Sequence, residues 1–167
     1  MNKIVSIFRG LLNTLMTLII IIGIVLILLY LKGIEPFIVL SGSMEPTIET
    51  GSISFIDKRV EYEKIKENDV IAFEASELAK VTHRVTSISK EGLETKGDAN
   101  NSADGILTTK TNYIGKNVFS IPKVGYVVRI IQTRTGKILL GTIVIVLLIA
   151  TFLTGETLGG KRYSEAN

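Results

Sequence analysis

The sequence has no cysteine and only one histidine among its 167 residues. Without cysteine, the chain forms no disulfide, no thiolate nucleophile and no cysteine-ligated metal site. A single histidine, His83, also excludes the common zinc sites that need several histidine ligands. The net charge is only +3 and no block of Lys and Arg stands out, so the charge pattern does not predict a nucleic-acid partner.

Hydrophobic residues are unevenly distributed along the chain. They make up 46% of it, close to the globular average, yet the mean hydropathy is +0.39. Residues 11–31 form one uncharged run, and about 20 residues suffice to cross a bilayer as a helix. We therefore predict a transmembrane anchor at 11–31 after an N-terminal segment, 1–10. A cleavable signal sequence is the alternative, but the run is long for one and no small-x-small cleavage site follows it.

A second apolar run, residues 138–153, is slightly short for a membrane span. Thr154 extends it, and Lys137 can place its charge at the membrane surface. We predict a second transmembrane helix over 137–154, followed by a tail at 155–167. A buried helix of the soluble domain is the alternative interpretation.

Basic residues at both ends of the chain predict its topology. Lys3 and Arg9 precede the first run, and Lys161 and Arg162 follow the second. Because Lys and Arg are enriched on the cytoplasmic side of spans, both termini are expected in the cytoplasm. The segment 32–136 is then extracytoplasmic, and the protein is a multi-pass protein of the cell membrane.

Segment 32–136 is predicted to be a small, mainly antiparallel β domain. Short runs rich in Val, Ile, Thr, Phe and Tyr alternate there with Gly, Asn and Asp. These runs are SISFIDK, DVIAFEA, KVTHRVTSIS, GLETKG and NYIGKNVFSI. Two further apolar stretches, 34–40 and 124–133, are expected to lie against the membrane surface.

A short serine loop, SGSMEPT at residues 41–47, is the first candidate for chemistry. Gly42 permits close backbone approach and Pro46 restrains the chain. Such a loop can present the hydroxyl and backbone N–H of Ser43 to one carbonyl group. An ordinary Ser/Gly/Pro loop is the plainer interpretation.

The lone histidine is the second candidate. His83 lies in a β-type run between Val81 and Val85. A histidine in a strand is most often a packed or surface residue. A serine hydroxyl, however, needs a base that titrates near neutral pH, and an imidazole supplies it.

Two aspartates six residues apart, Asp98 and Asp104, lie in a loop of small polar residues. Either carboxylate can accept the second ring N–H of His83, which fixes the tautomer of the imidazole. A plain turn between strands is the alternative for both. The residues alone leave the choice between the two aspartates open.

Together, these segments resemble the boxes of signal peptidase I. Residues 41–48, SGSMEPTI, are similar to the nucleophile box, in which the serine directly before the methionine is the nucleophile; this position matches Ser43. Bacterial members usually have Lys-Arg-Val where this chain has His-Arg-Val at 83–85. The endoplasmic-reticulum-type branch has His there. The resemblance covers roughly residues 37–125, and the two-span layout resembles the SipW-like branch and related archaeal enzymes.

The same branch carries a Lys-Gly-Asp-Asn-Asn box followed by a second aspartate. Here the box is KGDAN at 96–100, and its Ala99 departs from the usual Asn, which puts a loop hydrogen bond in doubt. The resemblance implies that Asp104 orients the histidine, and that the hydroxyl of Ser41 helps to hold the oxyanion. Asp98 is expected to bond its own loop in an Asx-type turn and to act mainly through stability.

The implied activity is hydrolysis of a peptide bond, after a small residue, in an exported preprotein. The implied fold is a small antiparallel β catalytic domain of the signal peptidase type, flanked by two transmembrane helices. Ser43 and His83 act through an acyl-enzyme, and no metal or organic cofactor is needed. The expected partners are preproteins with signal peptides and the lipid bilayer; the sequence identifies no partner subunit.

Two other functions are compatible with parts of the sequence. Repressor-type peptidases of related fold pair serine with lysine, and Lys80 lies near His83 in the chain. Such proteins are soluble, unlike a chain with two apolar runs. The other is a membrane-tethered binding or scaffold module without catalysis. Catalysis requires Ser43, His83 and an aspartate to lie within hydrogen-bond distance of one another, whereas a scaffold requires no such geometry.

Overall fold

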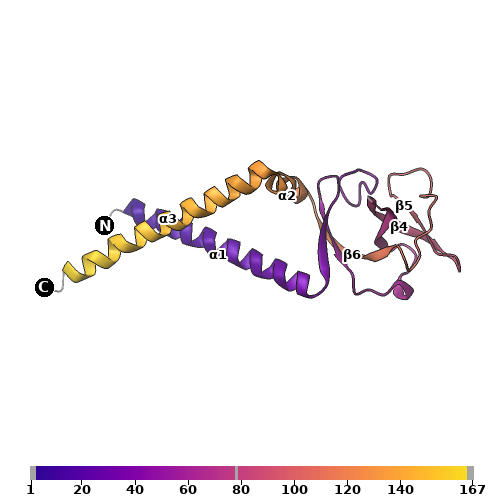
Figure 1. The fold of residues 1–167 in the computed structure, drawn as a ribbon, viewed down its shortest axis with the longest axis horizontal. Coiled ribbons are helices and arrows are strands. Elements are labelled where there is room, and N and C mark those ends of the chain that lie inside the picture. Colours follow the sequence, from indigo (N-terminus) through magenta and orange to yellow (C-terminus); the bar gives the residue numbers. More distant parts are fainter. Residues whose placement is uncertain (1–2, 78, 165–167) are drawn as a thin grey trace. The chain divides into compact units, whose positions relative to one another are not determined.

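The computed structural model of the chain describes residues 3–77 and 79–164, and describes side chains at 3, 6–77 and 79–150. It divides into two compact units. One comprises the described residues up to 27 and from 130 onwards, and the other comprises the described residues between 28 and 129. The first is helical and the second contains the sheet (Figure 1).

The N-terminal helix has the length and composition of a membrane span. Helix α1 runs from Lys3 to Leu31, and its Ser6–Leu31 part has a mean hydropathy of 2.9 with no buried residues in its most apolar window. Thr14 and Thr17 donate their hydroxyls to the carbonyls one turn earlier, at 2.9 and 2.8 Å. Their polar groups are therefore satisfied inside the apolar run. The expected anchor, 11–31, lies within α1.

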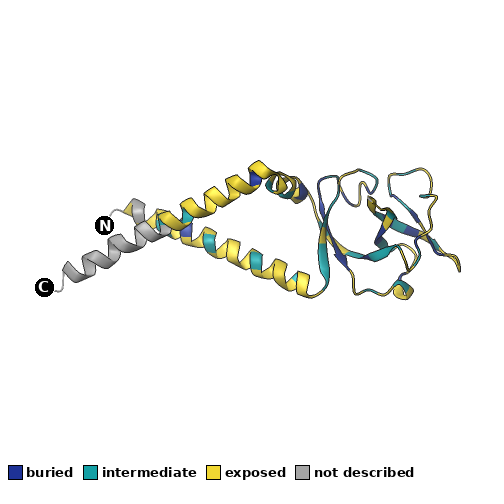
Figure 2. Cartoon of the chain, viewed as in Figure 1, coloured by how far each residue is buried: buried dark blue, intermediate teal, exposed yellow. Residues whose placement is uncertain are grey.

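The second predicted span also lies within a helix. Helix α3 extends from Arg134 to Ser164 and follows the shorter helix α2, Val124–Gln132, which corresponds to the segment expected at the membrane surface. Among the described residues, α3 meets the length and hydropathy test for a span only when paired with α2 as one broken span. The second transmembrane helix therefore stays a prediction. Figure 2 shows that most residues of α1 and of the described part of α3 are exposed.

The sheet has six strands in the order β1-β2-β6-β3-β4-β5, and every neighbouring pair is antiparallel. All five runs predicted from the sequence form strands. The strands are β1 Ile34–Ile38, β2 Ile53–Asp57, β3 Val70–Ser76, β4 Ala79–Ile88, β5 Leu93–Lys96 and β6 Tyr113–Ile121, with a short 3₁₀ helix, η1, at Tyr62–Lys64.

Strand β1 was not predicted, because its residues were interpreted as an apolar stretch following the anchor. It pairs only with β2, so it is an edge strand of the sheet. An edge strand tolerates Pro36, which has no N–H to donate.

One apolar cluster holds the central strands together. Its buried members are Ile65, Ile71, Phe73, Val85 and Leu93. On β4, His83 and Val85 are both buried, which follows the period-two alternation of a strand and points the imidazole inward.

The sheet is strongly curved. Lys80 of β4 places its ammonium 5.4 Å from the ring centre of Phe37 on β1, although three strands separate β4 from β1 in the sheet order. This curvature brings the chain that follows β1 close to β4.

Candidate active site

The loop after β1 is held by the residues that follow Ser43. Met44 is only 1% exposed and Ile48 only 4%. Backbone N–H groups of Glu45 and Ile48 donate to the carbonyls of Gly42 and Met44, at 3.0 and 2.8 Å. Because the residue next to Ser43 is buried in the core, the backbone at the serine has a fixed position, while Ser43 itself is only partly buried.

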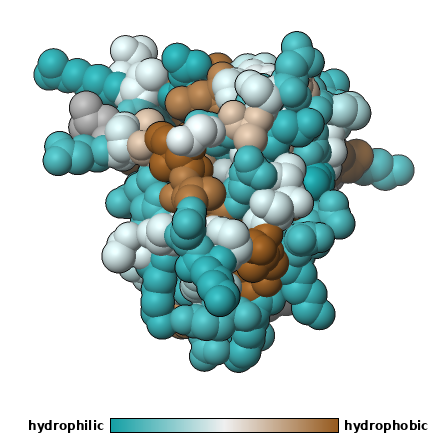
Figure 3. All heavy atoms as spheres, turned by 90° about the vertical axis from the view of Figure 1, so that its right-hand side faces the viewer, coloured by the Kyte–Doolittle hydropathy of each residue, from teal (hydrophilic) through white to brown (hydrophobic). Residues whose placement is uncertain are grey.

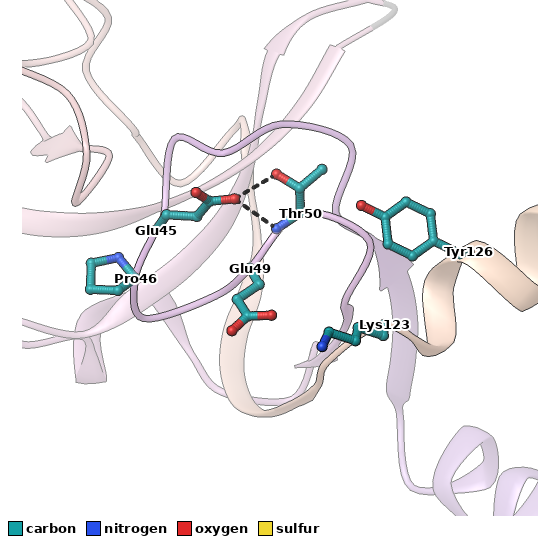
Figure 4. Close-up of a pocket in the computed structure, with 6 residues that line it drawn as sticks. All are labelled: Glu45, Pro46, Glu49, Thr50, Lys123 and Tyr126. Carbon is teal, nitrogen blue, oxygen red and sulfur yellow. Dashed lines mark hydrogen bonds between the residues drawn. The ribbon is translucent and has the colours of Figure 1, made fainter.

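A carboxylate closes the other end of this loop. The Oε1 atom of Glu45 accepts hydrogen bonds from the N–H and hydroxyl of Thr50, at 3.2 and 2.8 Å. These bonds lower the pKa of Glu45, the hydroxyl contributing most. Figure 4 shows both bonds beside a pocket of about 360 Å³. The pocket is lined by Glu45, Pro46, Glu49, Thr50, Lys123 and Tyr126, and so contains none of the candidate catalytic residues.

His83 lies between Ser43 and Asp104. Its Nδ1 atom is 2.7 and 2.8 Å from the two carboxylate oxygens of Asp104, and its Nε2 atom is 2.9 Å from Ser43 Oγ. A carboxylate only accepts, so Nδ1–H donates to Asp104 and Nε2 is left to accept the serine O–H. His83 is 7% exposed, and its imidazole meets the Phe73 ring edge-on, at 6.4 Å between ring centres. The three side chains therefore form a connected Ser–His–Asp arrangement.

Asp104 is fixed by a residue that the sequence analysis did not single out. Thr95, on β5, donates its hydroxyl to Asp104 Oδ2 at 2.6 Å. The backbone N–H of Asp104 donates in turn to the carbonyl of Thr95 at 2.9 Å. Thr95 is fully buried. The sequence gives one signal for this position: Leu93 and Thr95 are two residues apart in β5, so their side chains are expected to point to the same, inner face.

Asp98 has a different partner from the one expected. Its two carboxylate oxygens accept from Nε and Nη2 of Arg84, at 2.8 and 2.7 Å, instead of closing an Asx-type turn within its own loop. The hydrogen bonds from Arg84 lower the pKa of Asp98 and raise that of Arg84. Arg84 also donates to the carbonyl of Asn68 at 2.8 Å. Asp98 thus ties its loop to β4, and does not reach His83 by any hydrogen bond found in the described structure.

The same loop contacts the backbone of the serine. Ala99 donates its N–H to the carbonyl of Ser43 at 2.9 Å, a bond that alanine makes as well as asparagine does. A Cβ atom on Gly97 would lie 2.5 Å from that carbonyl oxygen. Glycine is therefore required at position 97, because any side chain would push the loop away from Ser43.

Ser41 is exposed, whereas Ser43 is partly buried. Their hydroxyl oxygens are 3.3 Å apart, and either is able to donate. The role in oxyanion binding implied for Ser41 stays a prediction. Among the residues that the structure describes, no group of three or more His, Cys, Asp or Glu side chains is placed to hold a metal ion.

Comparisons with known proteins identify the family of the chain. The family model for signal peptidase, peptidase S26, matches residues 11–122. The chain belongs to this family. The resemblance to signal peptidase I of the endoplasmic-reticulum and SipW-like type is thereby confirmed.

Individual relatives come from both bacteria and yeasts. Signal peptidase I W of Bacillus subtilis is 36% identical over 107 residues, which cover 58% of this chain and 56% of the relative. The signal peptidase complex catalytic subunit SEC11 of Debaryomyces hansenii is 35% identical over 54% of this chain and 61% of the relative. The SEC11 subunit of Scheffersomyces stipitis is 33% identical over 71% and 77%. The chain thus spans little more than half the length of the first two relatives.

Proposed function

We propose that this protein is a membrane-bound serine endopeptidase, a signal peptidase I that removes N-terminal signal peptides from exported preproteins. The observation that carries the proposal is the unbroken hydrogen-bonded path from Ser43 Oγ through His83 to the carboxylate of Asp104. The stability of the fold alone does not require a serine, a histidine and an aspartate from three separate segments to form such a hydrogen-bonded path. Their meeting in a chain of the S26 family supports catalysis over a tethered scaffold.

The geometry supports an acyl-enzyme mechanism. Ser43 Oγ attacks the scissile carbonyl carbon while Nε2 of His83 takes the hydroxyl proton. The imidazolium is stabilised by Asp104, and then gives that proton to the departing amine as the C–N bond breaks. The signal peptide stays bound to Ser43 as an ester. A water molecule, deprotonated by His83, hydrolyses the ester and regenerates the serine.

Negative charge on the carbonyl oxygen needs hydrogen-bond donors at that place. We assign this role to the backbone N–H of Ser43 and the hydroxyl of Ser41. The 3.3 Å separation of the two serine oxygens supports this assignment, because a carbonyl attacked by Ser43 Oγ would lie near both hydroxyls.

Open strand edges near the serine suit an extended peptide. The first half of β4, residues 79–83, pairs with β3 on one side, while β5 pairs only from Arg84 onwards. Strand β1, which leads to Ser43, pairs only with β2. A peptide chain can therefore add to these edges by backbone hydrogen bonds. We propose the cleavage region of a preprotein as that peptide.

The proposed membrane arrangement has two spans, with both termini in the cytoplasm. Helix α1 supports the first span directly. The described part of α3 supports the second, because Ile138, Leu139 and Ile145 are each about 60% exposed in the part of the chain that the structure describes. The β domain would then be extracytoplasmic, and Figure 3 shows that one of its faces is mostly hydrophilic, as a face in water requires.

Membrane attachment would serve the reaction. A signal peptide lies in the same bilayer, so enzyme and substrate search a surface and their effective concentration rises. Some relatives are named as catalytic subunits of a signal peptidase complex, and we propose no particular partner subunit for this chain.

A serine–lysine peptidase is a weaker candidate. Lys80 places its ammonium over the ring of Phe37, whereas the imidazole of His83 is the group at 2.9 Å from Ser43 Oγ. This placement favours His83 as the base.

Cleavage of a purified preprotein by the full chain in detergent or bilayers tests the proposal. The wild-type chain should release a mature protein with a new N-terminus after a small residue. Ser43→Ala should release none while keeping its fold and melting temperature. Full cleavage by Ser43→Ala would falsify the serine-peptidase proposal.

A further inference from the structure

Thr95 occupies a fully buried position beside the three candidate catalytic residues. It lies opposite Val85 in the pairing of β4 with β5. His83 precedes Val85 by two residues and so lies on the same face of β4. The side chain of Thr95 is therefore a diagonal neighbour of the imidazole across the two strands.

Two hydrogen bonds join Thr95 to Asp104. The hydroxyl of Thr95 donates to Oδ2 at 2.6 Å, and the backbone N–H of Asp104 donates to the carbonyl of Thr95 at 2.9 Å. The backbone bond fixes the position of the main chain at Asp104. The hydroxyl bond fixes the orientation of the Asp104 carboxylate. The same Oδ2 atom lies 2.7 Å from Nδ1 of His83. Thr95 thus contacts one of the two carboxylate oxygens through which Asp104 holds the imidazole.

We propose that Thr95 is a positioning residue for turnover, which holds the carboxylate of Asp104 in the orientation that His83 requires. This inference rests on the proposed peptidase function. A hydrogen bond to a charged group is stronger and more directional than a neutral one. Without it, the partly buried carboxylate loses its fixed orientation, and the imidazole loses its alignment with Ser43.

A second buried threonine provides a matched control. Thr108 is also fully buried, and its backbone pairs with Leu93 at the same edge of the sheet. Its hydroxyl has no hydrogen-bond partner in the described part of the chain. Replacement by valine removes the same hydroxyl at both sites, but only at Thr95 does this remove a contact with Asp104.

The first experiment measures preprotein cleavage by the full chain with Thr95→Val, Thr95→Ser and Thr108→Val. Losing one hydrogen bond to a charged group should lower kcat by about 10- to 100-fold in Thr95→Val, with KM changed by less than about 3-fold. Thr95→Ser should recover most of kcat because it keeps the hydroxyl. Thr108→Val should match the wild type. If kcat follows side-chain volume, so that serine is worse than valine, the proposal is overturned.

A double-mutant cycle separates positioning from general stability. Thr95→Val is combined with Asp104→Asn and compared with Asp104→Asn alone. If Thr95 acts through Asp104, the added valine should lower the residual kcat by less than about 3-fold, because residues in one network are not additive. Losses that multiply in full would show that Thr95 acts on the fold instead.

The single histidine gives a readout that is independent of turnover. With ¹⁵N-labelled histidine, the full chain yields the resonances of His83 alone. The Nδ1–H proton should be visible in the wild type and Thr95→Ser and broadened by exchange in Thr95→Val. An unchanged signal in Thr95→Val would overturn the proposal. Ser43→Ala distinguishes failure of the positioning role from failure of the proposed peptidase function. If Ser43→Ala is inactive while Thr95→Val is fully active, the positioning role of Thr95 fails and the proposed function stands.

Discussion

Arg84 and Asp98 form an ion pair with two hydrogen bonds, and each is adjacent to a candidate catalytic element. Arg84 directly follows His83 on β4, and Asp98 lies in the loop whose Ala99 holds the carbonyl of Ser43. The two side chains are 28% and 16% exposed. The pair therefore links the strand that carries the base to the loop that supports the nucleophile.

Asp98→Asn should reduce stability more than turnover. Asparagine keeps one hydrogen bond to Arg84 but loses the charge, which should lower the free energy of unfolding by about 1–3 kcal/mol. The measurement is the melting temperature of the full chain, with kcat on a preprotein as the second reading. A loss of kcat at an unchanged melting temperature would contradict this assignment.

Lowering the pH should remove the difference in melting temperature between Asp98→Asn and the wild type. The ion pair lowers the pKa of Asp98 in the folded state, so its stabilisation is complete above the unfolded pKa of about 3.9 and is lost as the pH falls through the lower folded value. Melting temperatures of both proteins between pH 7 and the acid limit of folding measure this. A gap that stays constant at low pH would mean that Asp98 stabilises by shape rather than charge.

Asp104→Asn should have the opposite profile. An amide in place of the carboxylate can no longer stabilise the imidazolium, and loss of the aspartate in a Ser–His–Asp triad lowers kcat by about 10⁴. The fold should remain, because the backbone bond from residue 104 to Thr95 is kept. Turnover and melting temperature, measured beside Asp98→Asn, test the assignment. A nearly silent Asp104→Asn would reverse the roles of the two aspartates.

Gly97→Ala should impair both folding yield and turnover. The added methyl group would lie 2.5 Å from the carbonyl oxygen of Ser43, so the loop or the serine must shift. We expect a loss of about 1–3 kcal/mol in stability, typical of overpacking, together with a lower kcat. Ala99→Asn is the matched control, since it keeps the N–H that bonds Ser43 and should be near neutral. Wild-type activity of Gly97→Ala would show that the close approach is not needed.

The proposed topology predicts which segments a protease can reach. Protease added to intact cells or right-side-out vesicles should cut exposed sites in the β domain, between residues 57 and 115, and leave the 156–167 tail intact. Epitope tags at the tail and in the domain make both fragments measurable. A tail that is cut from outside would show that 138–153 does not cross the membrane.

Local signals in the sequence were sufficient for five strands and for the serine, histidine and aspartate candidates, but not for the pairing of the strands or for all hydrogen-bond partners. Period-two runs located β2 to β6, whereas β1 was missed because Glu35 and Pro36 interrupt its pattern and its residues are only half-buried at the edge. The order β2-β6-β3 joins distant segments, which no local pattern encodes. The same reason explains Asp98: its context suggested a turn within its own loop, but its partner Arg84 lies on β4, which is distant in the sequence.

The central claim is that Ser43 and His83 act as one unit in peptide-bond hydrolysis. The direct test is kcat for preprotein cleavage by Ser43→Ala, His83→Ala and the double variant, each verified as folded by its melting temperature. Residues that act together are strongly non-additive, so each single variant should lose about as much activity as the double variant. Retained activity in either single variant, or losses that multiply in the double variant, would contradict the account.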